Sequence, residues 1–368
     1  MPPSPDTPEV SLESLLRALI ENSGSDLHLQ SGEVPMGRFQ GVLGRFELPP
    51  LEDPQVLGLA REVLRDPAKV AAFESSHDCD AAFAIEGLGR FRANLFFQRG
   101  RPGMVLRVIG TRILTLEELD LPPVLQTIAA ANDGLVLVTG ATGSGKSTTL
   151  AAMLDHLNST DARHIMTLED PIEFVHPNKR SLVNQREIGM DTESFASGLK
   201  HVLRQDPDVI LIGEMRDQES AAVALTAAET GHLVFGTLHT QDAAESLERM
   251  INLFPTDRGH QIRTQLSLGL RAIVCQRLLA RTGGGRIAAV EVLINTPRIR
   301  KLILEGDTPK IPGAIQAGRT EGLQTFNQAL TDLVKAGKAS EEEALATSPK
   351  PEELRMNLKG IFSGTSGL

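Results

Sequence analysis

The feature that most limits how this chain can fold is the stretch 140–147, which reads Gly-Ala-Thr-Gly-Ser-Gly-Lys-Ser. It follows the continuously apolar run Gly134–Thr139 and precedes a helical pattern over residues 146–158. A Gly-x-x-x-x-Gly-Lys-Ser sequence between a buried strand and a helix is typical of a phosphate-binding loop. Its glycines let backbone N–H groups turn toward an anion at the helix amino terminus. A chance glycine-rich turn is the alternative, and the flanking strand and helix argue against it.

Individual residues of this loop have predictable roles toward a magnesium nucleotide. Lys146 is expected to reach the β- and γ-phosphates, and the Ser147 hydroxyl is expected to ligate Mg²⁺. ATP and Mg²⁺ are therefore the predicted cofactors. The residues expected to hold the nucleotide are Gly140, Ala141, Thr142, Gly143, Ser144, Gly145, Lys146, Ser147 and Thr148.

Around this loop the sequence alternates between strand-like and helical segments. Apolar runs at 164–168, Val209–Ile212 and 233–237 are predicted strands, separated by helices near 195–204 and 218–230. Short, fully apolar strands alternating with helices predict a doubly wound α/β core with a parallel sheet. The last seventy or so residues are mostly helical in pattern.

Residues 11–113 have a different pattern. Ser11 is placed to cap a helix whose leucines share one face, and Asp53-Pro54 begins a second helix. Strand-like runs at 26–29, 80–85, 90–97 and 104–109 predict a small α+β domain. The predicted divisions are a disordered tail (1–10), an N-terminal domain (11–113), a linker (114–123), an ATPase domain (124–295) and a helical C-terminal region (296–368).

Charge and cysteine content argue against several classes of protein. With 37 basic and 47 acidic residues the formal charge is −10, which disfavours nucleic acid as a partner. Cys79 and Cys275 lie far apart, so a zinc ribbon or a disulfide scaffold is poorly supported. No apolar run approaches 18 residues, and the polar, proline-rich start does not resemble a secretory signal. We therefore expect a cytoplasmic chain without a transmembrane segment, able to dock on a membrane complex.

Acidic residues follow two of the predicted strands. Glu214 comes just after Val209–Ile212, a strand expected beside the phosphate-loop strand, and would hold Mg²⁺ through water. Glu169, Asp170 and Glu173 follow the strand at 164–168. One of these three is a natural base for the attacking water, although clustered acids often form only a solvated edge.

Two histidines, His232 and His239, lie at the two ends of the apolar run 233–237. We expect both at the mouth of the same sheet edge, where they would sense the γ-phosphate or contact a neighbouring subunit. A structural role is the alternative for each.

Together these segments resemble the secretion-superfamily ATPases of type II secretion and type IV pili, and most closely the pilus retraction ATPases. The resemblance runs from about residue 25 to about residue 330 and consists of four motifs in the family's order. These are the Walker A loop at 140–147, the aspartate box at 167–176, the Walker B segment at 206–217 and the histidine box at 227–240.

The resemblance implies a PAS-like N-terminal domain followed by a RecA-like ATPase domain with a helical C-terminal part. It assigns the catalytic base to Glu173 and the Mg²⁺-side carboxylate to Glu214, so that Ser147 and Glu214 are the metal residues. Arginines of the N-terminal domain approach the nucleotide across a hinge or subunit boundary in such motors. The expected catalytic residues are Glu173, Glu214, His232, His239, Arg92 and Arg107.

The function that the resemblance implies is a homo-hexameric motor that hydrolyses ATP to retract pili. Its partners would be a pilus platform protein of the inner membrane and paralogous pilus ATPases, at the cytoplasmic face of the pilus base. Assembly or secretion motors are one alternative, but they are usually longer and commonly carry a four-cysteine metal module. An accessory subunit that regulates a paralogue is a second alternative, and a nucleic-acid translocase is a distant one.

One stretch departs from the retraction ATPases. They carry Ala-Ile-Arg-Asn-Leu-Ile-Arg-Glu, whereas residues 298–305 read Arg-Ile-Arg-Lys-Leu-Ile-Leu-Glu. Helical spacing predicts a buried face formed by Ile299, Leu302 and Ile303, with Arg300 and Lys301 exposed.

Overall fold

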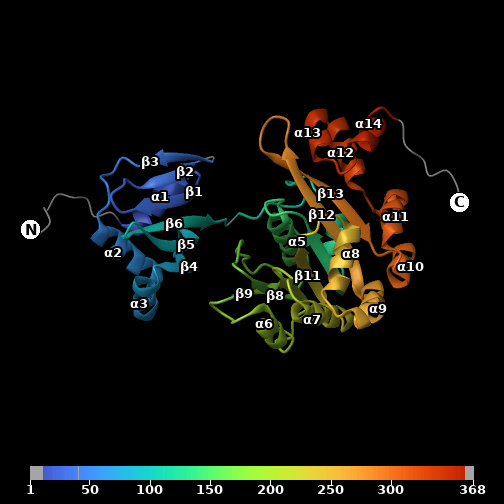
Figure 1. Ribbon diagram of the computed structural model, residues 1–368, viewed down its shortest axis with the longest axis horizontal. Helices are drawn as coiled ribbons and strands as arrows, with labels where there is room; N and C mark the ends of the chain where they lie inside the picture. The colour runs from blue at the N-terminus through green and yellow to red at the C-terminus, as the bar shows by residue number, and fades with distance from the viewer. Residues whose placement is uncertain (1–10, 40, 111, 361–368) are drawn as a thin grey trace, which may run out of the picture. The chain divides into compact units, whose positions relative to one another are not determined.

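The computed structural model describes residues 11–39, 41–110 and 112–360, so the predicted tail at 1–10 lies outside the described residues. The chain forms two compact units, Met1–Arg112 and Ile113–Leu368 (Figure 1). The finer division into a linker, an ATPase domain and a helical region stays a prediction. Each unit is described by itself below.

The first unit is a six-stranded antiparallel sheet covered by helices. Its strands are β1 (Gly24–Gln30), β2 (Met36–Phe39), β3 (Val42–Arg45), β4 (Asp78–Ile85), β5 (Gly89–Gln98) and β6 (Arg101–Ile109). Its helices are α1 (Leu12–Glu21), α2 (Asp53–Leu64) and α3 (Pro67–Ser76). The strand order is β3-β2-β1-β6-β5-β4.

Local sequence explains most of this unit. The Ser11 side chain accepts a hydrogen bond from the backbone N–H of Ser14, which caps α1, and the leucines of α1 are buried. The β2–β3 hairpin was not predicted, because each strand has only four residues and β3 exposes 71% of Val42.

The second unit is built on a seven-stranded sheet. Its strands are β7 (Gly134–Thr139), β8 (His164–Glu169), β9 (Leu182–Glu187), β10 (Val209–Ile212), β11 (Leu233–Leu238), β12 (Leu270–Ala280) and β13 (Arg286–Ile294). Helix α4 (Val124–Ala129) precedes β7. The helices between β7 and β12 are α5 (Lys146–Thr160), α6 (Phe195–Val202), α7 (Gln218–Glu229), α8 (Ala243–Asn252) and α9 (Gly259–Gly269). The strand order is β13-β12-β7-β11-β10-β8-β9, and every neighbouring pair is parallel except β12 with β13.

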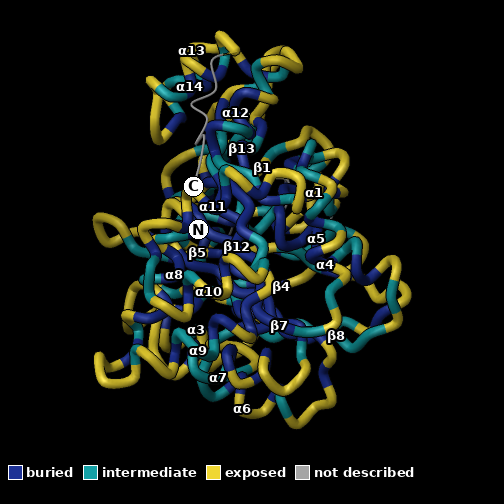
Figure 2. The backbone as a smooth tube through the Cα atoms, turned by 90° about the vertical axis from the view of Figure 1, so that its right-hand side faces the viewer, coloured by how far each residue is buried: buried dark blue, intermediate teal, exposed yellow. Residues whose placement is uncertain are grey.

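Helices cover both faces of this sheet, so the doubly wound α/β prediction is confirmed. Alternate residues of β7 contribute to two separate cores: Leu135 and Leu137 to one, Val136 and Val138 to the other. The first core includes residues of α6 to α9, and the second includes residues of α4 and α5. Strands β7 and β12 run through the buried interior, with exposed turns around them (Figure 2).

The strand order corrects one expectation. The strand that precedes Glu214, β10, is not beside the phosphate-loop strand β7, because β11 lies between them. Strand order is set by how the intervening helices cross the sheet, which no local pattern records. The β12–β13 hairpin was also not predicted, and it extends the sheet on the other side of β7.

After β13 the chain is helical among the described residues. The helices are α10 (Pro297–Glu305), α11 (Ile311–Ala317), α12 (Phe326–Lys335), α13 (Glu341–Thr347) and α14 (Pro351–Leu358), and 3₁₀ turns occupy Thr308–Lys310 and Arg319–Glu321. A further 3₁₀ turn, Thr256–Arg258, lies earlier in the chain, between α8 and α9. Within the described ranges, no helix is long and apolar enough to cross a membrane.

Helix α10 has the predicted amphipathic pattern. Ile299 and Ile303 are buried and Leu302 is half-buried, whereas Arg300 and Lys301 are exposed. The Thr296 hydroxyl accepts a hydrogen bond from the Ile299 N–H and caps the helix.

Candidate functional site

The phosphate-binding loop connects β7 to α5, as the sequence predicted. Gly140, Gly143 and Gly145 have φ of 141°, 78° and 90°, which side-chain-bearing residues rarely adopt. A Cβ at position 140 would also lie 2.5 Å from the backbone oxygen of Gln276. Gly140 is therefore required both by backbone conformation and by the close approach of β12.

Lys146 lies inside this loop, at the start of α5. Its Nζ donates to the backbone oxygens of Gly140 at 2.8 Å and Ala141 at 3.0 Å. Burial lowers the pKa of Lys146, and the charges of Glu214 and Glu173 act in the opposite direction. The ammonium group is therefore within electrostatic reach of both predicted catalytic carboxylates.

A cavity of ≈ 680 Å³ in the second unit contains the loop and these acidic groups. Its size suits a nucleotide, because small-molecule sites commonly measure about 300–1,000 Å³. Among the predicted site residues, those that line it are Thr142, Gly143, Gly145, Lys146, Ser147, Thr148, Glu173, Glu214 and His239. Gly140, Ala141 and Ser144 belong to the same loop without lining the cavity.

Glu214 is bracketed by two basic side chains. Its Oε2 lies 2.7 Å from a guanidinium nitrogen of Arg216, and its Oε1 lies 3.2 Å from Nε2 of His239. The hydrogen bond from Arg216 is the main reason that the pKa of Glu214 is lowered, although partial burial opposes it. Glu214 is therefore an anion near neutral pH.

The three acids after β8 have different surroundings. Glu169 accepts hydrogen bonds from the Thr167 hydroxyl at 2.6 Å and from Gln185 Nε2 at 3.0 Å, and burial raises its pKa. Asp170 faces the charge of Arg216. The exposed Glu173 carboxylate has no hydrogen bond or ion pair to the described residues, so it is available for a water molecule.

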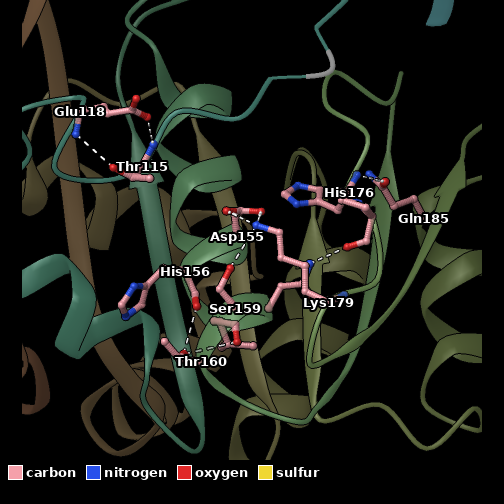
Figure 3. Close-up of polar contacts among 12 residues, drawn as sticks. Thr115, Glu118, Asp155, His156, Ser159, Thr160, His176, Lys179 and Gln185 are labelled. Atoms are coloured by element: carbon pink, nitrogen blue, oxygen red, sulfur yellow. Dashed lines mark hydrogen bonds and ion pairs between the residues drawn. The ribbon is translucent and has the colours of Figure 1, made fainter. Parts of the chain in front are cut away.

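The segment after Glu173 is attached to α5 by polar contacts (Figure 3). Lys179 Nζ lies 2.7 and 2.8 Å from the two carboxylate oxygens of Asp155 and donates to Ser159 at 3.1 Å. His176 lines the cavity, and burial lowers its pKa to about 4. It is therefore neutral at physiological pH, and no role was predicted for it although it ends the aspartate box.

The two histidines do not share a sheet edge, so that expectation was wrong. His232 precedes β11 and His239 follows it, which places them at opposite ends of a six-residue strand, roughly 20 Å apart. His232 Nδ1 lies 3.0 Å from the backbone oxygen of Ala227, and His232 does not line the cavity. Only His239 reaches the acidic groups. A subunit contact for His232 stays a prediction.

Arg92 and Arg107 lie opposite each other on β5 and β6 of the first unit. Arg107 Nε donates to Asp26 at 2.7 Å, while 70% of its side chain stays exposed. Arg92 is exposed and has no hydrogen bond or ion pair within the described residues. Both guanidinium groups are accessible, and their approach to a nucleotide stays a prediction.

Sequence reasoning gave no role to several side chains that line the cavity. Arg281 and Arg286 come from the β12–β13 hairpin, and Gln276 of β12 is buried with an unpartnered Oε1 among the described residues. The run Gly283-Gly-Gly between two apolar stretches was the signal that could have revealed this hairpin.

Comparison with known proteins gives a consistent result over nearly the whole chain. The family described as "Type II/IV secretion system protein" matches residues 103–346. The type IV pilus retraction ATPase PilT of Pseudomonas aeruginosa is 47% identical, over 93% of this chain and 99% of that protein. The type IV pilus ATPase PilU of the same organism is 43% identical, over 95% and 92%.

Solved structures agree with the sequence relatives. A crystal structure of the pilus retraction motor PilT with bound ADP superimposes with a TM-score of 0.88 at 43% identity, covering 94% of this chain and 99% of that one. The ATPase DotB of Legionella pneumophila gives a TM-score of 0.76 at 29% identity, covering 94% and 97%. With the phosphate-binding loop and the carboxylates around one cavity, these matches show that the chain belongs to the type II/IV secretion system protein family, as a PilT-like ATPase.

Proposed function

We propose that this chain is a ring-forming motor that hydrolyses ATP to retract type IV pili. The observation that carries the proposal is that one cavity brings together Lys146, Glu173 and Glu214, in a chain similar to a retraction ATPase over almost its full length. A nucleotide would bind with its phosphates on the 140–147 loop, where backbone N–H groups and Lys146 balance their charge.

The cavity residues fit a magnesium ion. The Ser147 hydroxyl at the start of α5 and the Glu214 carboxylate are both oxygen donors that line the same cavity, and oxygen donors are what Mg²⁺ prefers. A magnesium ion held by these two residues would supply positive charge for phosphoryl transfer.

We assign hydrolysis to the residues around this site. Glu173 takes a proton from the attacking water, because its carboxylate is exposed in the cavity, has no hydrogen bond to the described residues and lies within electrostatic reach of Lys146. Glu214 acts on the Mg²⁺ side, and His239 reports the state of the γ-phosphate through its contact with Glu214. These roles are supported by position in the cavity and by the order of the motifs.

We further propose a homo-hexamer whose sites are completed by neighbouring subunits. Arg92 and Arg107 are exposed guanidinium groups able to serve a neighbour, and His232 lies far enough from His239 to act at a subunit contact. The ring would act at the cytoplasmic face of the inner membrane, against the platform protein at the pilus base.

A strain that lacks this protein tests whether the motor retracts or assembles pili. Loss of a retraction motor should leave cells with more surface pili and without twitching motility. Cells without pili would instead show that the chain drives assembly, and the retraction proposal would be abandoned.

The 43% identity to PilU favours one second candidate, an accessory ATPase that acts beside a paralogous motor. The altered stretch at 298–305 is compatible with this role. Twitching that persists in the deletion strain, and disappears only when a paralogue is deleted as well, would support the accessory role.

A further inference from the structure

A layer of buried polar side chains lies beneath the phosphate-binding loop, outside the cavity. Its members, here called the buried polar layer, are less than a tenth exposed and come from five different elements or their ends: Thr139, Thr240, Ser246, Cys275 and Glu291. Burying a polar side chain costs free energy unless the side chain is hydrogen-bonded. We therefore expect each member of the layer to have a hydrogen-bond partner.

The members of the layer are connected by a continuous series of contacts. The hydroxyls of Ser246 and Thr240 lie 2.6 Å apart, and the Ser246 hydroxyl lies 3.4 Å from that of Thr139. The Cys275 thiol is hydrogen-bonded to Thr139 and Ser246, and Cys275 lies directly opposite Glu291 in the β12–β13 pair. The layer therefore extends from the last residue before the phosphate loop to β13.

Glu291 connects two helices to this layer. Its Oε1 accepts a hydrogen bond from the N–H of Ala243 at 2.9 Å, and its carboxylate also accepts one from the N–H of Phe326. Ala243 and Phe326 are the first residues of α8 and α12. One carboxylate thus satisfies a free amide at each of two helix amino termini, where the helix dipole favours a negative charge.

These contacts place Glu291 between the site and the C-terminal helices. Helix α8 begins shortly after His239, and its Ser246 is bonded to Thr240, the residue that follows His239. His239 in turn contacts Glu214 in the cavity. The first turns of α8 are therefore linked to the residue after His239 by a direct hydrogen bond.

We propose that Glu291 is a positioning residue for ATP hydrolysis. Its carboxylate holds the start of α8, which fixes His239 beside Glu214, and at the same time fastens α12 to that arrangement. The inference rests on the proposed motor function and adds to it a connection from the nucleotide site to the C-terminal helices.

The ionised carboxylate is the form that fits this role, because both of its oxygens accept hydrogen bonds whereas a protonated oxygen is a poor acceptor. The charged groups that face it are Asp242 at the cap of α8 and Arg277 on β12, whose guanidinium carbon lies 4.7 Å from the ring centre of Phe326. Burial outweighs Arg277 and raises the pKa of Glu291 to about 7. Turnover is therefore expected to rise as Glu291 loses its proton.

The test uses the 368-residue chain and its variant Glu291→Gln, with ATP turnover and KM measured from about pH 6 to pH 8, around the pKa of about 7. Glutamine presents an N–H group to one of the two helices, so it resembles the protonated form. We expect kcat to fall about 10- to 100-fold above neutral pH, the size typical of a small misplacement of catalytic groups. KM should stay within about threefold, because nucleotide binding is untouched.

Thr325→Ala is the matched control. It removes the side-chain cap of α12 without changing Glu291 or α8, so it lowers the melting temperature and leaves kcat and its pH profile unchanged. Wild-type kcat and pH profile in Glu291→Gln, or the same kcat loss in both variants, would reduce Glu291 to ordinary packing and overturn the inference.

Glu291→Asp keeps the inference testable if the glutamine variant does not fold. It preserves the charge on a shorter side chain, so a folded aspartate variant should recover part of kcat and keep the rise with pH. A folded aspartate variant whose turnover does not respond to pH overturns the positioning role. Absence of ATP hydrolysis in the unmodified chain would contradict the motor function itself, which is a separate outcome.

Discussion

Oε1 of Glu214 lies 3.2 Å from Nε2 of His239. This contact links the segments that follow β10 and β11, and both side chains line the nucleotide cavity. Arg216 holds the other oxygen of the same carboxylate at 2.7 Å. Glu214 therefore has two basic neighbours, one on each carboxylate oxygen, and it links Arg216 to His239.

Replacement of Lys146 by alanine should abolish tight ATP binding. The substitution removes the charge that faces the phosphates, and losing a charge-assisted hydrogen bond costs about 2 kcal/mol or more. Nucleotide affinity measured by calorimetry checks this. Lys200→Ala is a suitable control, because Lys200 is an exposed lysine paired with Glu219 on the surface. Equal affinity in the two variants would exclude the predicted phosphate contact.

Glu173→Gln should keep ATP binding and lose hydrolysis by about 100-fold or more, as expected when a general base is removed. Binding survives because the phosphates are held by the 140–147 loop. Turnover and affinity measured together separate the two roles, with exposed Glu193→Gln as the control. Wild-type turnover in Glu173→Gln would move the base to Glu169 or Glu214.

Arg107→Ala should lower turnover at least about tenfold if its guanidinium completes a neighbour's site. Arg61→Ala, which removes an exposed ion pair between Arg61 of α2 and Glu74 of α3, is the control. The decisive measurement is the turnover after Arg107→Ala subunits are mixed with Lys146→Ala subunits. Arg107→Ala subunits retain Lys146, and Lys146→Ala subunits retain Arg107, so mixed rings should regain part of the turnover. Absence of any recovery would contradict action between subunits.

Two buried groups should give opposite pH dependences of stability. Glu291 has its pKa raised from 4.5 to about 7, so its folded form keeps a proton that the unfolded chain releases. Its contribution to the free energy of unfolding is complete below pH 4.5 and is lost as pH rises through 7. His176 has its pKa lowered from 6.5 to about 4, so stability is lost as pH falls through that range.

Chemical denaturation as a function of pH resolves the two contributions. Relative to the unmodified chain, Glu291→Gln should gain stability as pH rises from 4.5 to 7, by roughly 3 kcal/mol for 2.5 pKa units. His176→Gln should show the reverse trend below pH 6.5. A difference that is constant with pH in either variant would show that the group does not titrate between folded and unfolded states in this way.

The sequence by itself determined the local chemistry of this protein. The phosphate-binding loop, its flanking strand and helix, and the cap at Ser11 depend on neighbouring residues alone, and each is found where it was predicted. The amphipathic pattern of α10 belongs to the same class, because helical spacing is a property of a single segment. Membership of the ATPase family followed from motifs of this kind.

Only the tertiary structure decided which of these local features meet. It placed β11 between β7 and β10, and it sent His232 and His239 to opposite ends of one strand. It also brought Arg281 and Gln276 to the cavity and put Glu291 between α8 and α12. Strand order and helix contacts depend on burial between segments far apart in the chain, and no local pattern encodes that choice.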